Sequence, residues 1–469
     1  MNKDLRQYLK TVKSAGSDYY LEVKKRLKSE LEVSVLQEKL ETEGRFPVLY
    51  CPEIEGSNLP LVTNLIGNYD RWAVAFGIDS ETYNKVGEAS IFQEHKRRWH
   101  EAKPVKVVQS SEAPVKEIIL RGKEADLNLL PITQHAELDS GKYITIGAMV
   151  CRDPDTGIPN VGAYRHELKG KNQLGCFIAP GNHGAYIAQR YAELGKPMEV
   201  VLFIGHHPMV ILGACTRGTL NMNELEVMGG LLGEPLEVTP AETVDLPVPT
   251  WAEIAIEGVI DSSKMITDGP LAEYYGYYGE GEQPCYLIQV TGMTMRKDAI
   301  YHDLNNAHRE HITWTVLPHE STAYDAVKKV VPSVQAVHIF PHTLGFRAAG
   351  VSIHQLHPGE AVVAGLAAIG EPEVKVAVVV DEDIDVYNEK ELLWAVGTRA
   401  VADLDIHIIP RMLGAKLDPS AYDFNRLKRG VMVSKVVIDA TKPMGQPFAT
   451  RTTPPRKLWE SMNLEDYLK

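Results

Sequence analysis

The sequence predicts a multidomain protein of the α/β and α+β classes. The chain has 469 residues, which at roughly 150 residues per domain suggests two to four domains. Between residues 143 and 300 the segments read mainly as strands, and after residue 333 strand-like and helix-like segments alternate. The first pattern favours a barrel or sandwich, and the second favours a layered βαβ domain.

The first 105 residues are expected to form an α/β segment. Residues 1–45 read as helical, and a helix there ends at Gly44, a residue suited to a C-cap. Two short strands, FPVLYC and LPLVTN, come next, followed by a helix around 70–76. The apolar residues at helical spacing in the first part are Leu31, Val35, Leu36 and Leu40.

Residues 106–315 are expected to form the β-rich domain. In KYITIGAMVCRD apolar residues alternate with others, which is the strand period, and DPDTG is a turn signal. NVGAYRHEL reads as a second strand, so the two predict a hairpin. A helix (YIAQRYAELG) and further strands (VKEIILRG, MEVVLFIG, WAEIAIEGVI, CYLIQVTGMTMR) predict a barrel or sandwich with helical insertions.

The remainder divides into a linking helix and a C-terminal domain. The stretch from Pro318 to Val330 predicts the helix, which we bound at 316–332. In residues 333–469 the segments VQAVHIF, GEAVVAGLAAIG, VKVAVVV, EKELLWAVGTRA and DIHIIP alternate between strand and helix patterns. The tail from Lys442 is rich in proline and threonine and then predicts a short acidic helix.

Charge and cysteine content exclude several classes of protein. The net charge of −13 argues against a nucleic-acid or anionic-membrane binder, although one buried arginine could still hold a small anionic substrate. The five cysteines are widely spaced and form no CxxC pair, which fits a reducing compartment. The sequence contains no apolar signal core and no run of about 20 apolar residues. We therefore expect a soluble cytoplasmic protein with no membrane partner.

The common cofactor and hydrolase motifs are missing from the sequence. No GxGxxG follows a strand, and GxxxxGK[ST], HExxH and GxSxG do not occur. Dinucleotide-binding, P-loop, zincin and α/β-hydrolase interpretations lose their usual support. A cofactor site in this chain must use another design.

Several polar residues stand in apolar or glycine-rich settings of the β-rich region, and each has an ordinary structural interpretation. Arg165 would serve as a salt-bridging arginine, His183 as a capping or surface histidine and Glu224 as the first residue of a helix, where a carboxylate suits the helix dipole. The tyrosines of YYGYY would be core residues. The remaining members of the group are Asn160, Asp268 and Glu273.

Taken together, the order and spacing of these motifs resemble the UbiD family of decarboxylases, which use prenylated flavin mononucleotide (prenylated FMN). The resemblance runs from about residue 45 to about residue 445 and is closest to members acting on hydroxylated benzoates. It implies an N-terminal α/β segment, a central split β-barrel that binds the flavin, a linking helix and a C-terminal α/β domain for oligomerisation. The motifs are YITIGAMVCRDPDTGIPNVGAYR, DGPLAEYYGYY, ILGACT, GGLLGEPLEV, MRKDAIYH, VKVAVVVDEDIDVYN and SKVVIDATKP.

The resemblance also assigns cofactor and metal ligands. Asn160, His183 and Glu224 match positions that bind Mn²⁺ or Mg²⁺, and an amide oxygen, an imidazole and a carboxylate suit such an ion. The ion would bridge protein and flavin phosphate, with K⁺ as a further ion. Lys375 would reach the cofactor from the C-terminal domain, or else be a lysine at a strand edge. The other positions matched to cofactor contacts are Val161, Gly162, Ala163, Tyr164, Arg165, Asn182, Ala214, Cys215, Thr216 and Arg217.

Arg165, Asp268 and Glu273 match the family's catalytic residues, in which Glu273 donates the proton after CO₂ leaves. A proton donor must hold its proton, and burial among Tyr274, Tyr275 and Tyr277 beside an ionised Asp268 would raise its pKa. Arg165 would hold one carboxylate ionised and orient the substrate acid. The family usually has Glu at position 268, so the shorter Asp268 leaves the role of that residue less defined than that of Glu273.

Two geometric questions remain open in the sequence. Asn160 and Arg165 are five residues apart, so in an ideal strand they face opposite sides, unless a bulge near Gly162 or the end of the strand intervenes. In HDLNNAHREH, His302 and Arg309 are candidate substrate contacts, with a solvated loop as the alternative. Weaker candidates, in GFRAAGVSIHQLH, are Arg347 and His354.

The resemblance implies a decarboxylase of an aromatic, heteroaromatic or α,β-unsaturated acid that releases CO₂. It also implies a flavin prenyltransferase as cofactor supplier and assembly as a homodimer or homohexamer. Two alternatives remain: an aryl or phenol carboxylase subunit running in the reverse direction, and a non-catalytic flavin- or metal-binding subunit of a complex. Isotope exchange with bicarbonate tests the first, and turnover of a panel of acids tests the second.

Overall fold

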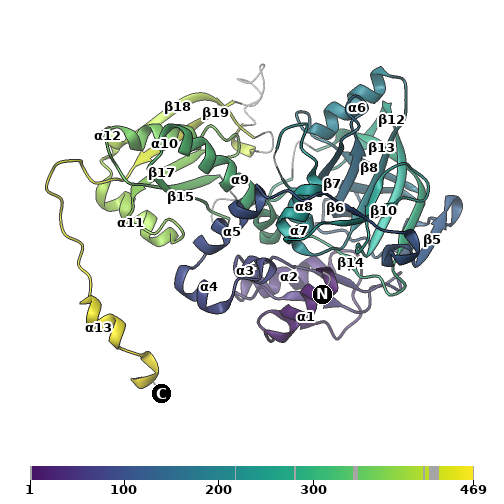
Figure 1. Ribbon diagram of the computed structural model, residues 1–469, viewed down its shortest axis with the longest axis horizontal. Helices are drawn as coiled ribbons and strands as arrows, with labels where there is room; N and C mark the ends of the chain where they lie inside the picture. The colour runs from purple at the N-terminus through teal and green to yellow at the C-terminus, as the bar shows by residue number, and fades with distance from the viewer. Residues whose placement is uncertain are drawn as a thin grey trace.

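The computed structural model describes residues 3–216, 218–278, 281–341, 347–415, 418–421 and 432–467. Figure 1 shows three regions: the N-terminal elements in purple and blue, a large teal body of strands, and a green to yellow C-terminal region on the other side of helix α9 (Arg309–Val330). A multidomain fold with both sheets and helices is therefore confirmed.

The N-terminal region combines a small sheet with five helices. Its strand order is β1-β2-β3-β14, with β1 parallel to β2, β2 antiparallel to β3 and β14 parallel to β3. The last strand comes from far along the chain, so this sheet is completed only after the barrel has been traversed. The elements are α1 (Leu5–Ser14), β1 (Tyr20–Glu22), α2 (Glu32–Thr42), β2 (Val48–Cys51), β3 (Leu61–Thr63), α3 (Asp70–Phe76), α4 (Ser80–Val86), α5 (Ala89–Trp99) and β14 (Tyr301–His302).

The first 45 residues depart from the expected helical run in two ways. Strand β1 interrupts them, because residues 20–22 pair with β2. Helix α2 also buries a different face: Val33 and Gln37 are buried, whereas Val35 is 51% exposed. Gly44 does follow the end of α2 in the left-handed conformation, with φ of 74°, a backbone geometry that glycine adopts without strain.

The central region is a closed barrel of six strands. Its order is β12-β9-β6-β7-β8-β13, and pairing of β12 with β13 closes the ring. Strand β5 (Ile118–Arg121) extends β13 on the outside. The barrel strands are β6 (Tyr143–Arg152), β7 (Pro159–Gly170), β8 (Gln173–Phe177), β9 (Met198–Ile204), β12 (Ile254–Asp268) and β13 (Gln283–Met295).

The predicted hairpin of β6 and β7 is present. Its antiparallel register runs from Arg152 opposite Pro159 to Tyr143 opposite Glu167. A register shift lies between Ile144 and Gly147, which places the irregularity opposite Arg165 rather than near Gly162. Strand β6 is buried along both faces up to its last residue, so its apolar alternation marks a strand that is covered on two sides.

Helices and a small second sheet cover the barrel. Helix α8 packs against α7 and against β7, and α6 contacts β7 and β12. The three-stranded sheet has the order β11-β10-β4. These elements are β4 (Lys106–Val107), α6 (His183–Glu193), α7 (Pro208–Ala214), α8 (Glu224–Leu232), β10 (Glu237–Pro240) and β11 (Pro247–Pro249).

Helix α9 (Arg309–Val330) connects the barrel to the C-terminal region and is longer than the expected linking helix. Pro318 lies inside it and is buried. Proline normally breaks a helix interior, but packing against surrounding elements holds this one together. The edge-to-face contact of Trp314 with Trp72 of α3, at 5.2 Å between ring centroids, ties α9 to the N-terminal region.

The C-terminal region is a five-stranded mixed sheet with helices. Its order is β15-β16-β17-β19-β18, with β16, β17 and β19 parallel and the two outer strands antiparallel to their neighbours. The sequence patterns do not predict strand β16, which the structure places next to β15. The elements are β15 (Val334–Ile339), β16 (Ala348–Ile353), α10 (Glu360–Ala368), β17 (Val376–Asp381), α11 (Glu389–Arg399), α12 (Ala402–Asp405), β18 (Ile406–Leu413), β19 (Met432–Asp439) and α13 (Arg456–Ser461).

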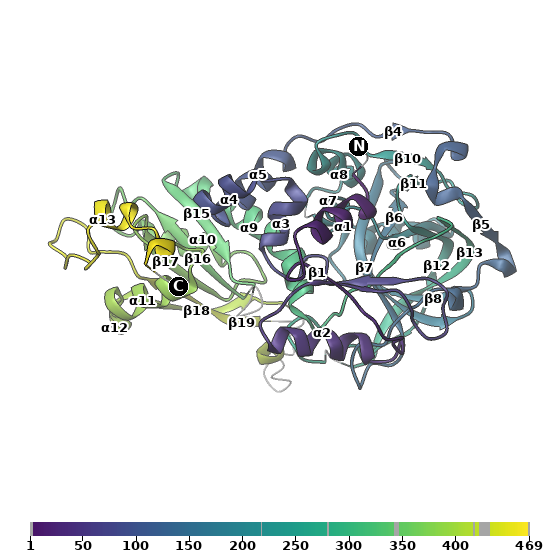
Figure 2. The same cartoon turned by 90° about the horizontal axis from the view of Figure 1, so that it is seen from below.

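The chain ends in a segment that leaves this sheet. Figure 1 shows the stretch after β19 running away from the C-terminal region to α13, and Figure 2 shows it at the outer end of that region. No helix among the described residues has the length and apolar character that crossing a membrane requires. All five cysteines are unpaired thiols.

Candidate active site

Arg165 of β7 joins two carboxylates that are distant in the sequence. Its Nε and Nη2 donate hydrogen bonds to Oδ2 of Asp268, at 3.0 and 2.6 Å, and its Nη1 donates to Oε1 of Glu273. Asp268 is the last residue of β12, and Glu273 lies in the loop between β12 and β13. The barrel therefore brings together the three residues to which the family resemblance assigns a catalytic role.

The cluster is almost completely withdrawn from solvent. The side chains of Arg165, Asp268 and Glu273 are 11%, 0% and 6% exposed. The Arg165 guanidinium lies over the Phe177 ring, 4.4 Å from its centroid, an aromatic contact that favours a cation. Oδ1 of Asp268 receives no hydrogen bond from the described residues. A buried carboxylate oxygen of this kind is ready to accept a further donor.

Burial controls the protonation of the two acids. Desolvation raises the pKa of Glu273, opposed by the Arg165 guanidinium and reinforced by the charges of Asp268 and Asp139. Desolvation also raises the pKa of Asp268, against the opposing effect of Arg165. Asp268 receives two hydrogen bonds from Arg165 and Glu273 one, so Asp268 is the better stabilised as an anion.

The tyrosines that follow Glu273 do not all cover it as expected. Tyr274 is half-buried and meets the His311 ring edge-on, with centroids 5.2 Å apart. Tyr275 lies beneath Arg347, 5.3 Å from ring centroid to guanidinium carbon. Tyr277 is 59% exposed, so the expectation that it helps bury the carboxyl is wrong. Its backbone carbonyl instead accepts the Glu273 N–H.

Two of the three predicted metal ligands are in contact. The side-chain amide of Asn160 donates to Oε1 of Glu224 at 3.0 Å, and the Val161 N–H donates to Oε2 at 3.0 Å. Glu224 does begin a helix, α8, but it is 2% exposed, and burial raises its pKa to about 7. His183 is the first residue of α6 and is half-buried.

Asn160 and Glu224 have the ligand chemistry that a divalent cation requires. No cationic side chain among the described residues pairs with Glu224, so its buried charge lacks a counter-ion. Asn160 is 5% exposed and offers an amide oxygen after rotation of the side chain. Oxygen ligands together with an imidazole are suited to Mn²⁺ or Mg²⁺.

Tyr164 belongs to the β7 segment that is predicted to lie along the cofactor. Asn160 lies at the start of the strand, and the Tyr164 side chain folds back over Gly162 and Gly184. A Cβ atom on either glycine would approach the Tyr164 hydroxyl to 2.5 or 2.6 Å. The two glycines therefore make room for Tyr164.

The other predicted cofactor contacts lie on α6, around the end of α7 and in the C-terminal region. Asn182 is the N-cap residue of α6, Ala214 ends α7, and Cys215 is its C-cap. Thr216 is half-buried directly after α7. Arg217 lies outside the described residues. Lys375 forms an ion pair with Asp418 at 2.8 Å within the C-terminal region.

The segment 302–311 is not a solvated loop. His302 is completely buried near Trp314, with ring centroids 6.2 Å apart, and burial lowers its pKa to about 4. Arg309 opens α9, lies over the Phe46 ring at 4.1 Å and donates to Asn68. Neither side chain has a described contact with Arg165 or its two carboxylates.

The weaker substrate candidates fall in the C-terminal region. Arg347 forms an ion pair with Glu373 at 2.6 Å in addition to its contact with Tyr275. His354 is exposed and pairs with Glu382 at 3.0 Å. Of the two, Arg347 is the one that contacts the loop carrying Glu273.

Sequence reasoning missed the residues that support the cluster. Asp139 accepts a hydrogen bond from the Ala272 N–H, and Glu167 and the Tyr143 hydroxyl accept from the Gly269 N–H. Phe177 lies beneath Arg165. The aspartate in AELDSG was a turn signal, but nothing in the sequence showed that the turn meets a loop 130 residues away.

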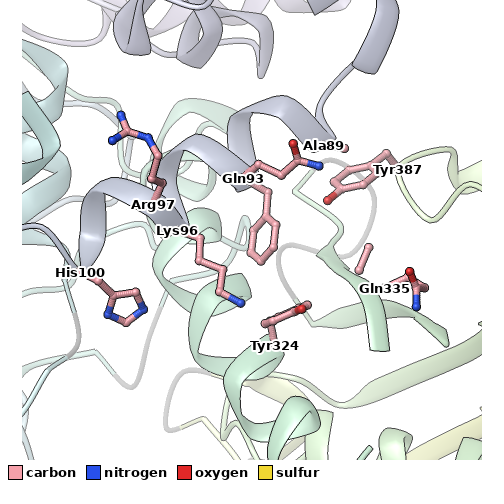
Figure 3. A pocket seen from close by; sticks show the side chains of 10 residues that line it. Ala89, Gln93, Lys96, Arg97, His100, Tyr324, Gln335 and Tyr387 are labelled. Atoms are coloured by element: carbon pink, nitrogen blue, oxygen red, sulfur yellow. The ribbon is translucent and has the colours of Figure 1, made fainter. Parts of the chain in front are cut away.

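A cavity of about 470 Å³ lies elsewhere, between α5 and the C-terminal region. Figure 3 shows Lys96 pointing from α5 toward Tyr324 of α9, with Tyr387 on the far side. The Lys96 ammonium is 3.5 Å from the centroid of the Tyr324 ring. None of the predicted site residues lines this cavity.

Family profiles match three consecutive parts of the chain. Residues 16–90 match the 3-octaprenyl-4-hydroxybenzoate carboxy-lyase N-terminal domain, residues 106–308 the Rift-related domain, and residues 313–440 the C-terminal domain of the same family. Together they span most of the chain.

Two relatives with decarboxylase names support the same family. The chain is 37% identical to anhydromevalonate phosphate decarboxylase of Methanothermobacter thermautotrophicus over 69% of this chain and 75% of that protein. It is 29% identical to phenolic acid decarboxylase of Sedimentibacter hydroxybenzoicus over 94% and 92% of the two chains.

Solved structures extend the match to the whole fold. The UbiD-class enzyme HmfF from Pelotomaculum thermopropionicum, solved in complex with FMN, superimposes with a TM-score of 0.90 at 33% identity, covering 99% of this chain and all of that one. The vanillic acid decarboxylase of Sedimentibacter hydroxybenzoicus, in closed form, gives 0.85 at 28% identity over 100% and 99%. The chain therefore belongs to the UbiD family of carboxy-lyases.

Proposed function

We propose that this protein is a decarboxylase that uses bound prenylated FMN to release CO₂ from a small aromatic, heteroaromatic or α,β-unsaturated acid. The observation that carries the proposal is the buried contact of Arg165 with Asp268 and Glu273 inside a barrel of this family. A buried guanidinium between two acids with different surroundings suits a substrate carboxylate on one side and a proton donor on the other.

Asp268 and Arg165 form the fixed part of the proposed site. The fully buried Asp268 holds Nε and Nη2 of Arg165, which sets the plane of the guanidinium. Phe177 supports that plane from one side. A guanidinium oriented in this way can bind a carboxylate with directional hydrogen bonds, which a lysine ammonium cannot do.

Glu273 is the proposed proton donor. Its raised pKa keeps it protonated at a higher pH than an exposed glutamate. When bound, prenylated FMN would supply the electron-withdrawing centre on which the substrate loses CO₂. The Glu273 proton then moves to the substrate carbon, and the resulting Glu273 carboxylate is stabilised by Nη1 of Arg165. Reprotonation from solvent returns the site to its starting state.

We further propose that Asn160, His183 and Glu224 would hold Mn²⁺ or Mg²⁺, whose charge would neutralise the flavin phosphate. The buried, unpaired charge of Glu224 and its contact with Asn160 support this assignment. The remaining cofactor contacts are assigned to residues 161–165, 182 and 214–217 and to Lys375, with K⁺ as a further ion. A flavin prenyltransferase would supply the cofactor.

The proposal also covers the substrate contacts, the assembly and the cellular location. His302 and Arg309 remain candidate determinants of the substrate, although each is buried against other side chains in this structure. Apolar side chains on the C-terminal surface support a homodimer or homohexamer, and an evolved form of the related enzyme HmfF is described as dimeric. The free cysteines agree with a cytoplasmic location. The exposed apolar residues that support assembly through the C-terminal surface are Leu393, Leu404, Ile408 and Leu413.

The test is turnover by cofactor-loaded protein. The chain is produced together with a flavin prenyltransferase and incubated with hydroxybenzoates, furan carboxylates and anhydromevalonate phosphate, the last because the relative of 37% identity is named for it. We expect bound flavin, bound Mn²⁺ and CO₂ release from at least one acid. Loaded protein that releases no CO₂ from any of them would refute the proposal and favour a non-catalytic binding role.

A further inference from the structure

Asp139 is the buried residue of an otherwise largely exposed turn, and it links that turn to the loop that carries Glu273. Its Oδ2 accepts hydrogen bonds from the N–H groups of His135 and Ala136, at 3.2 and 2.7 Å, and so closes its own turn. Its Oδ1 accepts from the Ala272 N–H at 2.8 Å. Ala272 directly precedes Glu273, so this bond holds the backbone one residue before the proposed proton donor.

The same turn holds the Glu273 loop at two further points. The Ser140 N–H donates to the Pro270 carbonyl at 2.8 Å, and the Leu138 N–H donates to the Tyr278 hydroxyl at 2.9 Å. Within the loop itself, Ala272 and Tyr278 form one isolated antiparallel bridge, and the Glu273 N–H donates to the Tyr277 carbonyl. Residues 138–140 therefore hold both arms of a loop that has little regular backbone pairing of its own.

The turn itself is anchored in the protein interior. Nε2 of His135 lies 3.0 and 3.1 Å from the two carboxylate oxygens of Asp303, and the Thr133 hydroxyl donates to the same carboxylate at 2.8 Å. All three side chains are buried, as is Asp139 at 7% exposure. A support held by buried hydrogen bonds can fix the position of the group that it carries.

We propose that Asp139 is a positioning residue for Glu273: its carboxylate holds the loop so that the Glu273 carboxyl meets Arg165 and the reacting carbon. The proposal rests on the assignment of Glu273 as proton donor. A carboxylate is needed because N–H groups converge on both oxygens. Asparagine has one acceptor oxygen and one NH₂ donor group. Its NH₂ group would face a backbone N–H, and two donors cannot form a hydrogen bond with each other.

The charge of Asp139 acts on Glu273 in the same direction. Together with the charge of Asp268, it raises the pKa of Glu273 and so favours the proton-carrying form, while Arg165 acts in the opposite direction. Loss of the Asp139 charge would therefore lower the fraction of Glu273 that carries a proton, as well as loosen its loop.

The test compares D139N and D139E with D4N in the full-length protein. Asp4 is a matched control, because it is 8% exposed and caps helix α1 by accepting the Gln7 N–H at 2.8 Å. Amide hydrogen exchange of peptides covering 270–278 is expected to be at least about tenfold faster in D139N than in wild type and unchanged in D4N. Unaltered exchange of this loop in D139N would overturn the proposal whether or not the protein is active.

The second part of the test measures the activity of the cofactor-loaded enzyme. D139N is expected to lower kcat roughly 10- to 100-fold with little change in KM or flavin content, since misplacing a reacting group by about 1 Å costs about that much. D139E, which keeps the charge, should recover part of the rate. In an E273Q background D139N should cause no further loss, because its effect acts through Glu273.

The outcomes separate the two proposals. A rate loss by D139N that persists undiminished in the E273Q background would refute positioning through Glu273. If wild-type protein turns over no acid, the proposed function fails alone, and the hydrogen exchange of the loop decides whether Asp139 holds it. If the melting temperature of D139N is much lower than that of D4N, the hydrogen exchange and the kcat of D139E are compared with those of wild type instead.

Discussion

Replacement of Arg165 by lysine separates the geometry of the guanidinium from its charge. Arg165 donates from Nε and Nη2 to Asp268 and from Nη1 to Glu273. A lysine keeps the positive charge but has one nitrogen at the end of a flexible chain, so it can serve only one of these carboxylates at a time. Two of the three hydrogen bonds are then lost.

The expected magnitude follows from those two bonds. A hydrogen bond to a charged group contributes about 1.5–3 kcal/mol, and this site is almost entirely buried. Loss of the two bonds would raise the activation free energy by about 3–6 kcal/mol, which corresponds to a fall of roughly 10²- to 10⁴-fold in kcat/KM. The assay is CO₂ release by cofactor-loaded R165K with the acid that wild type turns over best.

Arg399 offers a matched control for this substitution. Its side chain is 1% exposed and also holds two carboxylates, Asp381 and Asp383, but within the C-terminal region. R399K should lower the free energy of unfolding and leave kcat within about threefold of wild type, because it lies outside the proposed site. A kcat/KM of R165K within tenfold of wild type, or an equal loss in R399K, would refute the reasoning.

Four further predictions concern the donor, its partner, the metal and the core. E273Q should lower kcat by roughly 10²- to 10⁴-fold with flavin still bound, and the kcat of wild type should fall as the pH rises through the raised pKa of Glu273, since the protonated acid is the active form; a flat pH profile would contradict this. D268E should keep kcat within about tenfold, because the charge facing Arg165 remains, and a larger loss would show that the shorter side chain is required. E224Q should reduce bound Mn²⁺ and flavin together, measured by elemental analysis and absorbance, whereas loss of neither contradicts the ligand assignment. W72A should cost about 3–5 kcal/mol in chemical denaturation, because Trp72 is fully buried; a cost under 1 kcal/mol would mean that the site collapses to fill the cavity.

The sequence predicted the barrel strands well because their patterns are local. The β6–β7 hairpin has a turn signal between two apolar runs, and Arg165 lies in the second of them. The contact of Arg165 with Asp268 and Glu273 could be anticipated only through the family resemblance. Spacing alone does not show that residues about 100 positions apart meet at one end of a barrel.

The errors share a physical cause, which is long-range packing. Helix α2 turns Gln37 inward because its side-chain amide pairs with His308 at 2.8 Å, so its buried face is partly polar. Helix α9 continues through Pro318 because the surrounding core holds it. The polar segment that includes His302 is buried because β14 pairs with β3. In each case a distant partner overrides the local signal.

The pairing of β14 with β3 has a consequence for biosynthesis. As the nascent chain leaves the ribosome, the N-terminal sheet lacks its outer strand until residues 301–302 emerge, after all six barrel strands. Until then β3 exposes unpaired N–H and C=O groups that could recruit another chain. A truncated gene product ending before residue 300 should therefore aggregate rather than accumulate as an isolated first domain.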